Sequence, residues 1–195
     1  MPDTVGVVIP SRTLTEGIRV AKQVRGVDEV IVQLGSPVPP GHARNLGFRK
    51  THSEIVVFID DDVSIEPWYL SWLRTRPPTE SWWAPTWACG VNDEWTRRAV
   101  MLYNLLQVPI PYMTLGAFIA VRRAPFEAVK GFNALAFAED SDLGNRLGIL
   151  GITKTVMPHY VTALKPIPSV QKVMDRYPEW SKFPCPKDTP FLRVR

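Results

Sequence analysis

The chain has 195 residues, a formal net charge of +4 and a hydrophobic fraction of 45%. This length fits one domain with a sizeable core, and the scattered lysines and arginines argue against a nucleic-acid partner. The sequence shows neither a signal-peptide pattern nor an apolar run near the roughly 20 residues of a membrane helix. We therefore expect a soluble cytoplasmic protein, and peripheral contact with an anionic membrane surface stays open.

The two cysteines, Cys89 and Cys185, lie far apart in the sequence and lack the spacing of metal ligands. Reduced thiols are the usual state in a cytoplasmic protein. We therefore expect two thiols, and the sequence leaves open whether they pair.

Short apolar runs and helical segments alternate through the first 60 residues. The apolar runs are Val5–Pro10, Asp28–Leu34 and Glu54–Asp60, and the helical segments are Leu14–Arg25 and His42–Thr51. Continuously apolar strands separated by helices predict βαβ units, and hence an α/β fold with a mostly parallel sheet flanked by helices. Ligands of such sheets bind beyond the carboxyl ends of the strands.

The rest of the chain continues with alternating elements. We predict strands at Trp82–Cys89, Thr114–Arg122, Ile152–Met157 and Tyr160–Leu164, and helices at Pro67–Arg76, Asn92–Gln107, Pro125–Val129 and Glu139–Leu150. From about Pro166 the sequence is rich in proline and weakly patterned. We therefore predict one domain over residues 1–165 and a tail over residues 166–195 that packs on the domain or extends from it.

Three adjacent aspartates, Asp60, Asp61 and Asp62, follow the third apolar run. Like charges this close repel one another, so the cluster needs a cation or a proton. Carboxylate oxygens on a loop suit Mg²⁺ or Mn²⁺, and the first and third side chains of a D-x-D pattern leave the strand end on the same side. The cluster predicts a metal or phosphate site, with a solvated turn that caps a helix as the alternative.

A second acidic group, Glu139 and Asp140 followed by Asp142, opens a predicted helix. Acids in a first helical turn interact favourably with the helix dipole, so capping explains the group as well as catalysis does. Both interpretations stay open on these residues alone.

Six of the seven tryptophans fall between residues 68 and 95. Aromatic rings fill cores, and they also stack on the faces of sugars. For Trp82, Trp83 and Trp87 we keep both interpretations, core packing and contact with a sugar or lipid.

Five patterns occur in order over residues 5–159. They are Val7–Arg12 (VVIPSR), Ala43–Gly47 (ARNLG), Phe58–Val63 (FIDDDV), Gly116–Asn133 (GAFIAVRRAPFEAVKGFN) and Glu139–Leu147 (EDSDLGNRL). Together they resemble the motifs of family 2 glycosyltransferases, whose GT-A fold is a Rossmann-like, mostly parallel sheet that binds nucleotide-diphospho-sugars. The resemblance implies a hexosyltransferase that uses Mn²⁺ or Mg²⁺ and a hydroxyl acceptor on a sugar, a lipid-linked sugar or a protein.

The resemblance also implies roles for individual residues. It makes Asp140 the general base and makes Asp60, Asp62 and His159 metal ligands. It places the donor beside Pro10, Ser11, Arg12, Gln33, Arg44, Asp60, Asp61 and Gly116. Arg44 either lies near the donor or braces the acidic loop, and Asp61 faces solvent, braces the loop or shares the metal's charge.

The chain departs from the family at Gln33, because an acid usually precedes Gly-Ser there and contacts the base. The nucleotide therefore stays open, while a base opposite the leaving group favours inversion. One alternative is a degenerate GT-A domain that binds nucleotide sugars without turnover. Another is a haloacid-dehalogenase-like phosphatase with Asp60 as nucleophile, although two strand–helix units precede Asp60. A sugar nucleotidyltransferase would need a glycine-rich signature that Val7–Arg12 lacks.

Overall fold

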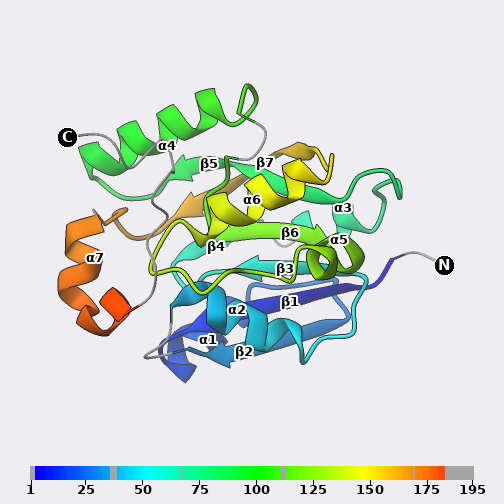
Figure 1. Ribbon diagram of the computed structural model, residues 1–195, viewed down its shortest axis with the longest axis horizontal. Coiled ribbons are helices and arrows are strands. Elements are labelled where there is room, and N and C mark those ends of the chain that lie inside the picture. Colours follow the sequence, from blue (N-terminus) through cyan, green and yellow to red (C-terminus); the bar gives the residue numbers. More distant parts are fainter. Residues whose placement is uncertain (1–2, 36–38, 67, 111–112, 169, 183–195) are drawn as a thin grey trace.

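The computed structural model describes residues 3–35, 39–66, 68–110, 113–168 and 170–182. Over these residues the chain forms one twisted sheet with helices on both faces (Figure 1). The strands are β1 (Val5–Ser11), β2 (Glu29–Leu34), β3 (Ile55–Ile59), β4 (Val63–Ile65), β5 (Trp82–Cys89), β6 (Phe118–Arg122) and β7 (Lys154–Ala163). Their order across the sheet is β2-β1-β3-β6-β5-β7-β4.

The sheet is mainly parallel, as predicted. β1 pairs in parallel with β2 and β3, and β5 pairs in parallel with β7. β6 lies antiparallel between β3 and β5, and β4 lies antiparallel to β7 at the edge. Five strands therefore run in one direction, so their carboxyl ends share one side of the molecule, where ligands of such sheets bind.

Two layers of helices cover the sheet. Helices α1 (Leu14–Ala21), α3 (Tyr69–Leu73) and α4 (Glu94–Leu106) pack on one face, and α2 (Pro40–Phe48), α5 (Arg123–Ala128) and α6 (Glu139–Ile149) pack on the other. Alternate residues of one strand enter opposite clusters, as Val7 and Val8 of β1 do, because successive side chains point to opposite faces. Because the strands are apolar on both sides, helices on both faces of the sheet are needed to bury them.

The three tryptophans of β5 are core residues. Trp82 and Trp83 are fully buried, and Trp87 is 3% exposed. Trp82 joins the cluster under α5 and α6, whereas Trp83 and Trp87 join the cluster under α1, α3 and α4. The core interpretation therefore holds for Trp82 and Trp83, whereas Trp87 packs in the core and also lines a cavity.

Several predicted boundaries were wrong. The first helix ends at Ala21, four residues before Arg25, and α4 takes Asp93 as its N-cap in place of Asn92. The Asp93 carboxylate accepts a hydrogen bond from the backbone N–H of Thr96 at 2.7 Å, which satisfies a donor that the first turn leaves unpaired.

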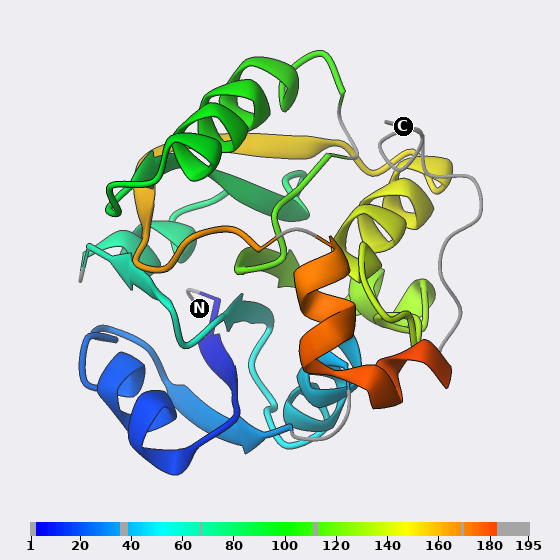
Figure 2. The same cartoon turned by 90° about the vertical axis from the view of Figure 1, so that its left-hand side faces the viewer.

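The last third also differs from its prediction. The two late strands are one strand, β7, whose register against β5 shifts between Pro85 and Thr86. The tail, for which we predicted no helix, forms helix α7 (Val170–Arg176) and a 3₁₀ turn (Pro178–Lys182). Figure 2 shows α7 standing in front of the carboxyl ends of the strands.

Two further findings bear on the sequence expectations. Cys89 is a free cysteine, and Cys185 lies outside the described residues, as does Pro67 at the start of a predicted helix. Within the described part of the chain, no helix is both long and apolar enough to cross a bilayer.

Candidate functional site

The three aspartates form the turn between β3 and β4, beside the carboxyl end of β1. The Asp61 carboxylate accepts a hydrogen bond from Ser11 Oγ at 2.6 Å and one from the Arg12 backbone N–H at 3.4 Å. Its carbonyl accepts from the Arg19 guanidinium. Of the three roles open for Asp61, these contacts favour bracing, since its side chain ties the acidic turn to β1.

Arg44, on α2, lies under the acidic turn with 1% of its side chain exposed. Its Nη2 donates to Asp60 Oδ1 at 2.7 Å and to the Gly116 carbonyl at 2.9 Å. Its Nη1 donates to Glu139 Oε1 at 2.5 Å. The guanidinium is thus occupied by the protein itself, which favours bracing over donor contact for this residue.

Asp140 enters the site from the first turn of α6. The residue before the helix, Ala138, has a left-handed backbone with φ of 58°. The Asp140 carboxylate accepts a hydrogen bond from the Ser141 N–H at 2.7 Å. Burial and then the Glu139 charge raise the pKa of Asp140 to about 7, a value suited to a general base near neutral pH.

The aspartates of the turn also have raised pKa values. Burial raises the pKa of Asp60 to about 7, with Arg44 opposing the shift and Asp62 adding to it. Burial raises the pKa of Asp62 as well, and the Asp61 charge raises it further. A nearby cation would stabilise these carboxylates, because positive charge favours their ionised forms.

One cavity brings carboxylates of the acidic turn together with the carboxylate of Asp140. A space of about 340 Å³ is lined by Asp60, Asp62 and Asp140, with Gly116 and Trp87 in its wall. A Cβ on Gly116 would lie 3.3 Å from Arg44 Nη2 and 3.3 Å from Asp140 Cβ. The glycine therefore keeps open the space between the two acidic groups.

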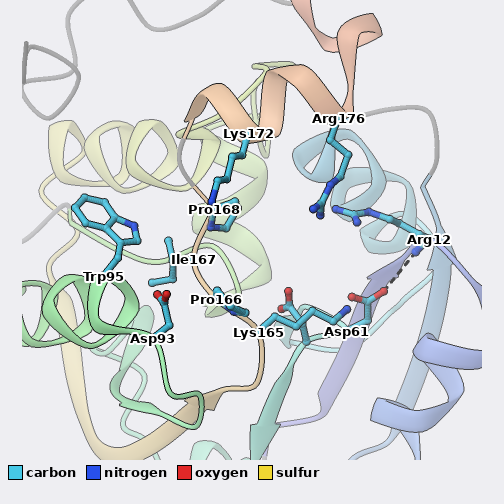
Figure 3. A pocket seen from close by; sticks show the side chains of 11 residues that line it. Arg12, Asp61, Asp93, Trp95, Lys165, Pro166, Ile167, Pro168, Lys172 and Arg176 are labelled. Atoms are coloured by element: carbon cyan, nitrogen blue, oxygen red, sulfur yellow. Dashed lines mark hydrogen bonds between the residues drawn. The ribbon is translucent and has the colours of Figure 1, made fainter.

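A larger cavity of about 740 Å³ adjoins it beneath α7. Figure 3 shows Lys172 and Arg176 projecting from α7 into the cavity, with Arg12 pointing toward Arg176 from the end of β1. Lys165 lines both cavities, as Asp62 does. The larger cavity therefore combines positive side chains with the acidic turn, which suits an anionic ligand that carries a cation.

The residues present fit a divalent cation. Asp60 and Asp62 face one cavity, supply hard oxygen atoms and have raised pKa values that positive charge would lower. Within the described residues no cluster of three histidines, cysteines or acids is arranged to hold a metal. Mg²⁺ and similar ions often take one or two carboxylates and complete their shell with water and phosphate oxygens.

The predicted donor and metal residues divide into two groups. The structure brings Arg12, Arg44, Gly116, Asp140 and the acidic turn to the cavities. Pro10, Ser11 and Gln33 are buried at the ends of β1 and β2 and line neither of the two cavities.

Gln33 uses its amide within the chain, since Nε2 donates to the Leu34 carbonyl at 2.8 Å. The predicted contact between Gln33 and a base stays a prediction. His159 falls within β7, and its side chain lies outside what the structure describes.

Sequence reasoning missed four residues of the site. Glu139 stood beside Asp140 in the same motif, and Lys165 follows the last predicted strand. Lys172 and Arg176 are four residues apart, a spacing that places them on one face of a helix, but no helix was expected there.

The sequence matches no protein-family model and no curated protein, whereas its fold has solved counterparts. The fold is the GT-A fold of glycosyltransferases. The mannosyltransferase PcManGT from Pyrobaculum calidifontis, solved with GDP-Man and Mn²⁺, matches with a TM-score of 0.57 at 15% identity over 87% of this chain and 60% of that one. TarS 1–349 from S. aureus, solved with UDP-GlcNAc, matches with a TM-score of 0.60 at 15% identity over the same shares.

GalNAc-T7, solved with UDP, GalNAc and Mn²⁺, matches with a TM-score of 0.61 at 12% identity over 89% of this chain and 48% of that one. Identities this low establish the fold alone. The chain spans 60% or less of the length of these three proteins.

Proposed function

We propose that the chain is a glycosyltransferase that moves a sugar from a nucleoside-diphosphate sugar to a hydroxyl acceptor. The observation that carries the proposal is the shared cavity, where Asp60 and Asp62 from the β3–β4 turn face Asp140 from α6. The GT-A fold supports it, because ligands of such sheets bind beyond the carboxyl ends of the strands and solved proteins of this fold contain GDP-Man, UDP-GlcNAc or UDP.

The donor's diphosphate fits the larger cavity. Arg12, Lys165, Lys172 and Arg176 line it and would balance the phosphate charge. Asp62 lies where the two cavities meet, so a diphosphate beside it would direct its sugar into the smaller cavity toward Asp140. The nucleoside would then lie near Ser11 and Arg12, at the end of β1.

The reaction forms a bond between the acceptor oxygen and the anomeric carbon and breaks the bond from that carbon to the diphosphate. Asp140 accepts the hydroxyl proton, and the diphosphate leaves with the bonding electron pair. A divalent cation held by Asp60 and Asp62 would stabilise the charge that develops on the leaving group. With Asp140 opposite the leaving group, attack is in line and inverts the anomeric centre.

A nucleophilic role for Asp60, as in a phosphatase, has less support. Its Oδ1 is engaged by the buried Arg44, and the Asp60 backbone N–H donates to the Ala117 carbonyl at 2.9 Å. A side chain held this way is suited to a fixed ligand position. Trapping of a phosphoryl group on Asp60 would overturn this assignment.

Donor binding is the first test. Thermal unfolding with a panel of nucleotides and nucleotide sugars, with and without Mn²⁺, should show one nucleotide class that raises Tm in a Mn²⁺-dependent way. Asp62→Ala should remove the Mn²⁺ dependence. Equal Tm shifts in the variant and the wild type would exclude the metal role of Asp62.

Asp140→Asn tests the chemistry apart from binding. The amide keeps the shape of the side chain but cannot take up the proton. We therefore expect the rate of sugar transfer to fall about 10²–10⁴-fold, while donor affinity stays within about threefold. Full transfer activity in Asp140→Asn would exclude this residue as the base. Donor binding by the wild type without transfer to any hydroxyl acceptor would favour a binding domain.

A further inference from the structure

The buried Arg44 joins two parts of the site that are far apart in the sequence. It contacts Asp60, which is 16 residues away, and Glu139, which is 95 residues away. Asp60 belongs to the metal and donor side of the cavity, and Glu139 precedes the proposed base on α6. A single guanidinium therefore connects the two groups that must be aligned for transfer.

The surrounding backbone makes room for this connection. A Cβ on Gly41 of α2 would lie 3.0 Å from Glu139 Cγ and 3.2 Å from the Asn133 carbonyl. The positive φ of Ala138 lies immediately before Glu139. Small or strained backbone positions thus flank the Glu139 side chain, which is itself only 9% exposed.

We propose that Glu139 and Arg44 are positioning residues that hold the proposed base, Asp140, at a fixed separation from the donor carboxylate, Asp60. The inference rests on the proposed function for its catalytic consequence. Glu139 and Asp140 are adjacent on one helical turn, so fixing the first carboxylate limits the movement of the second. Alignment matters because a misplacement of about 1 Å at a reacting centre can cost on the order of 10²-fold in rate.

The chain contains a matched pair that separates positioning from simple stability. Arg122 contacts Asp3 at 2.8 Å, with 9% of the arginine side chain and 27% of the aspartate side chain exposed. The corresponding exposures of Arg44 and Asp60 are 1% and 26%. Arg122 lies on β6 and also donates to the Glu80 carbonyl at 2.7 Å, remote from the residues that line the cavities. Loss of the ion pair should therefore reduce stability by a similar amount at both places, but it should lower kcat only at Arg44.

The kinetic test compares Glu139→Gln and Arg44→Lys with Arg122→Lys. We expect Glu139→Gln to lower kcat about 10- to 100-fold with the donor Kd changed less than about threefold, since the amide keeps the shape and loses the charge. Glu139→Asp, which restores the charge on a shorter side chain, should recover part of kcat. Arg122→Lys should leave kcat within about twofold of the wild type, although it should lower the urea midpoint of unfolding about as much as Arg44→Lys does. Equal kcat losses for Arg44→Lys and Arg122→Lys would overturn the inference.

A second readout does not depend on activity. The Asp60 backbone N–H is hydrogen-bonded to the Ala117 carbonyl, so its amide hydrogen exchange reports how firmly the acidic turn is held. Glu139→Gln should speed this exchange about tenfold, although Glu139 is remote in sequence, whereas Arg122→Lys should not. Unchanged exchange would refute the connection between Glu139 and the turn.

The two readouts separate this inference from the proposed function. Faster exchange in a protein whose wild type neither binds nor transfers a nucleotide sugar would refute the proposed function and keep the connection. Normal transfer and normal exchange in Glu139→Gln would refute the connection and keep the proposed function.

Discussion

Two neighbouring regions of the site differ in the burial and in the net sign of their charged groups. In the buried region, the guanidinium of Arg44 faces three carboxylates, those of Asp60, Glu139 and Asp140, and contacts two of them directly. In the open region beneath α7, four cations line the cavity together with three aspartates; these residues are Arg12, Lys165, Lys172, Arg176, Asp61, Asp62 and Asp93. The first region has an excess of negative charge around a buried guanidinium, and the second has an excess of positive charge and more open space.

The difference separates two tasks. Buried, mutually bonded charges lose little entropy when a ligand arrives, so they suit the fixed alignment of reacting groups. Exposed cations on long side chains gain little from surface ion pairs and can turn toward an incoming anion. The buried region should therefore dominate stability and rate, while the open region should dominate donor affinity.

Arg44→Ala should show the largest effect on stability. It leaves Asp60 and Glu139 buried without their shared partner, so we expect the free energy of unfolding to fall by about 3–5 kcal/mol at pH 7. Urea unfolding followed by circular dichroism measures this. As the control, Arg97→Ala removes an arginine that is 58% exposed and paired with Glu94, and should cost under about 0.5 kcal/mol. A loss below about 1 kcal/mol in Arg44→Ala would mean that the buried region is not tightly held.

Removing the charges of α7 should change affinity instead. The double variant Lys172→Ala with Arg176→Ala takes two positive groups from the cavity, and alanine preserves helix propensity. We expect the Kd of the nucleoside diphosphate to rise about 10- to 50-fold, with less dependence on salt, and the free energy of unfolding to change by under about 1 kcal/mol.

The matched control removes the same net charge elsewhere. Arg49 and Lys50 are exposed residues that follow α2, outside the lining of the cavities. Their double alanine variant should alter Kd by less than about threefold in calorimetric titrations. Equal losses of affinity in the two double variants would show that overall charge, and not the α7 surface, attracts the diphosphate.

The two regions also differed in how far their residues could be predicted. The acidic turn follows an apolar strand whose pattern is strong over a short window, so its place at the carboxyl edge was predictable, whereas the role expected for Asp140 came from the family resemblance. The pairing of Arg44 with Glu139 depends on how α2 and α6 meet in three dimensions, which no local pattern contains. The role of Glu139 was therefore missed, although its neighbour was named.

Helix α7 was missed for a different reason. It has seven residues, Val170–Arg176, in a segment rich in proline, and so short a helix owes its stability to tertiary contacts. One such contact precedes it, where the Ile167 backbone N–H donates to Thr96 Oγ1 on α4 at 2.9 Å. Another follows it, where the Arg12 guanidinium stacks on the Tyr177 ring at 4.6 Å. Both contacts join residues that are remote in sequence.

The smallest expected effect is a pH dependence that arises at Asp140 in the buried region. The pKa of Asp140 is raised to about 7 by burial and the Glu139 charge, while an unfolded aspartate titrates near 4. The folded state therefore binds a proton that the unfolded state releases, so this contribution to stability is present below pH 4 and is lost as the pH rises through 7.

Because Asp140 keeps some contact with solvent, we expect about 1–2 kcal/mol of this loss between pH 5 and pH 8, less than the full shift would give. Urea unfolding at the two pH values should show a larger decline for the wild type than for Asp140→Asn, which cannot ionise. Addition of Mn²⁺ should reduce the decline in the wild type, since a cation at the neighbouring carboxylates favours ionised forms. Parallel declines in both proteins would mean that Asp140 ionises in the folded state as readily as in water, and the excess negative charge of the buried region would then be balanced by groups other than a proton.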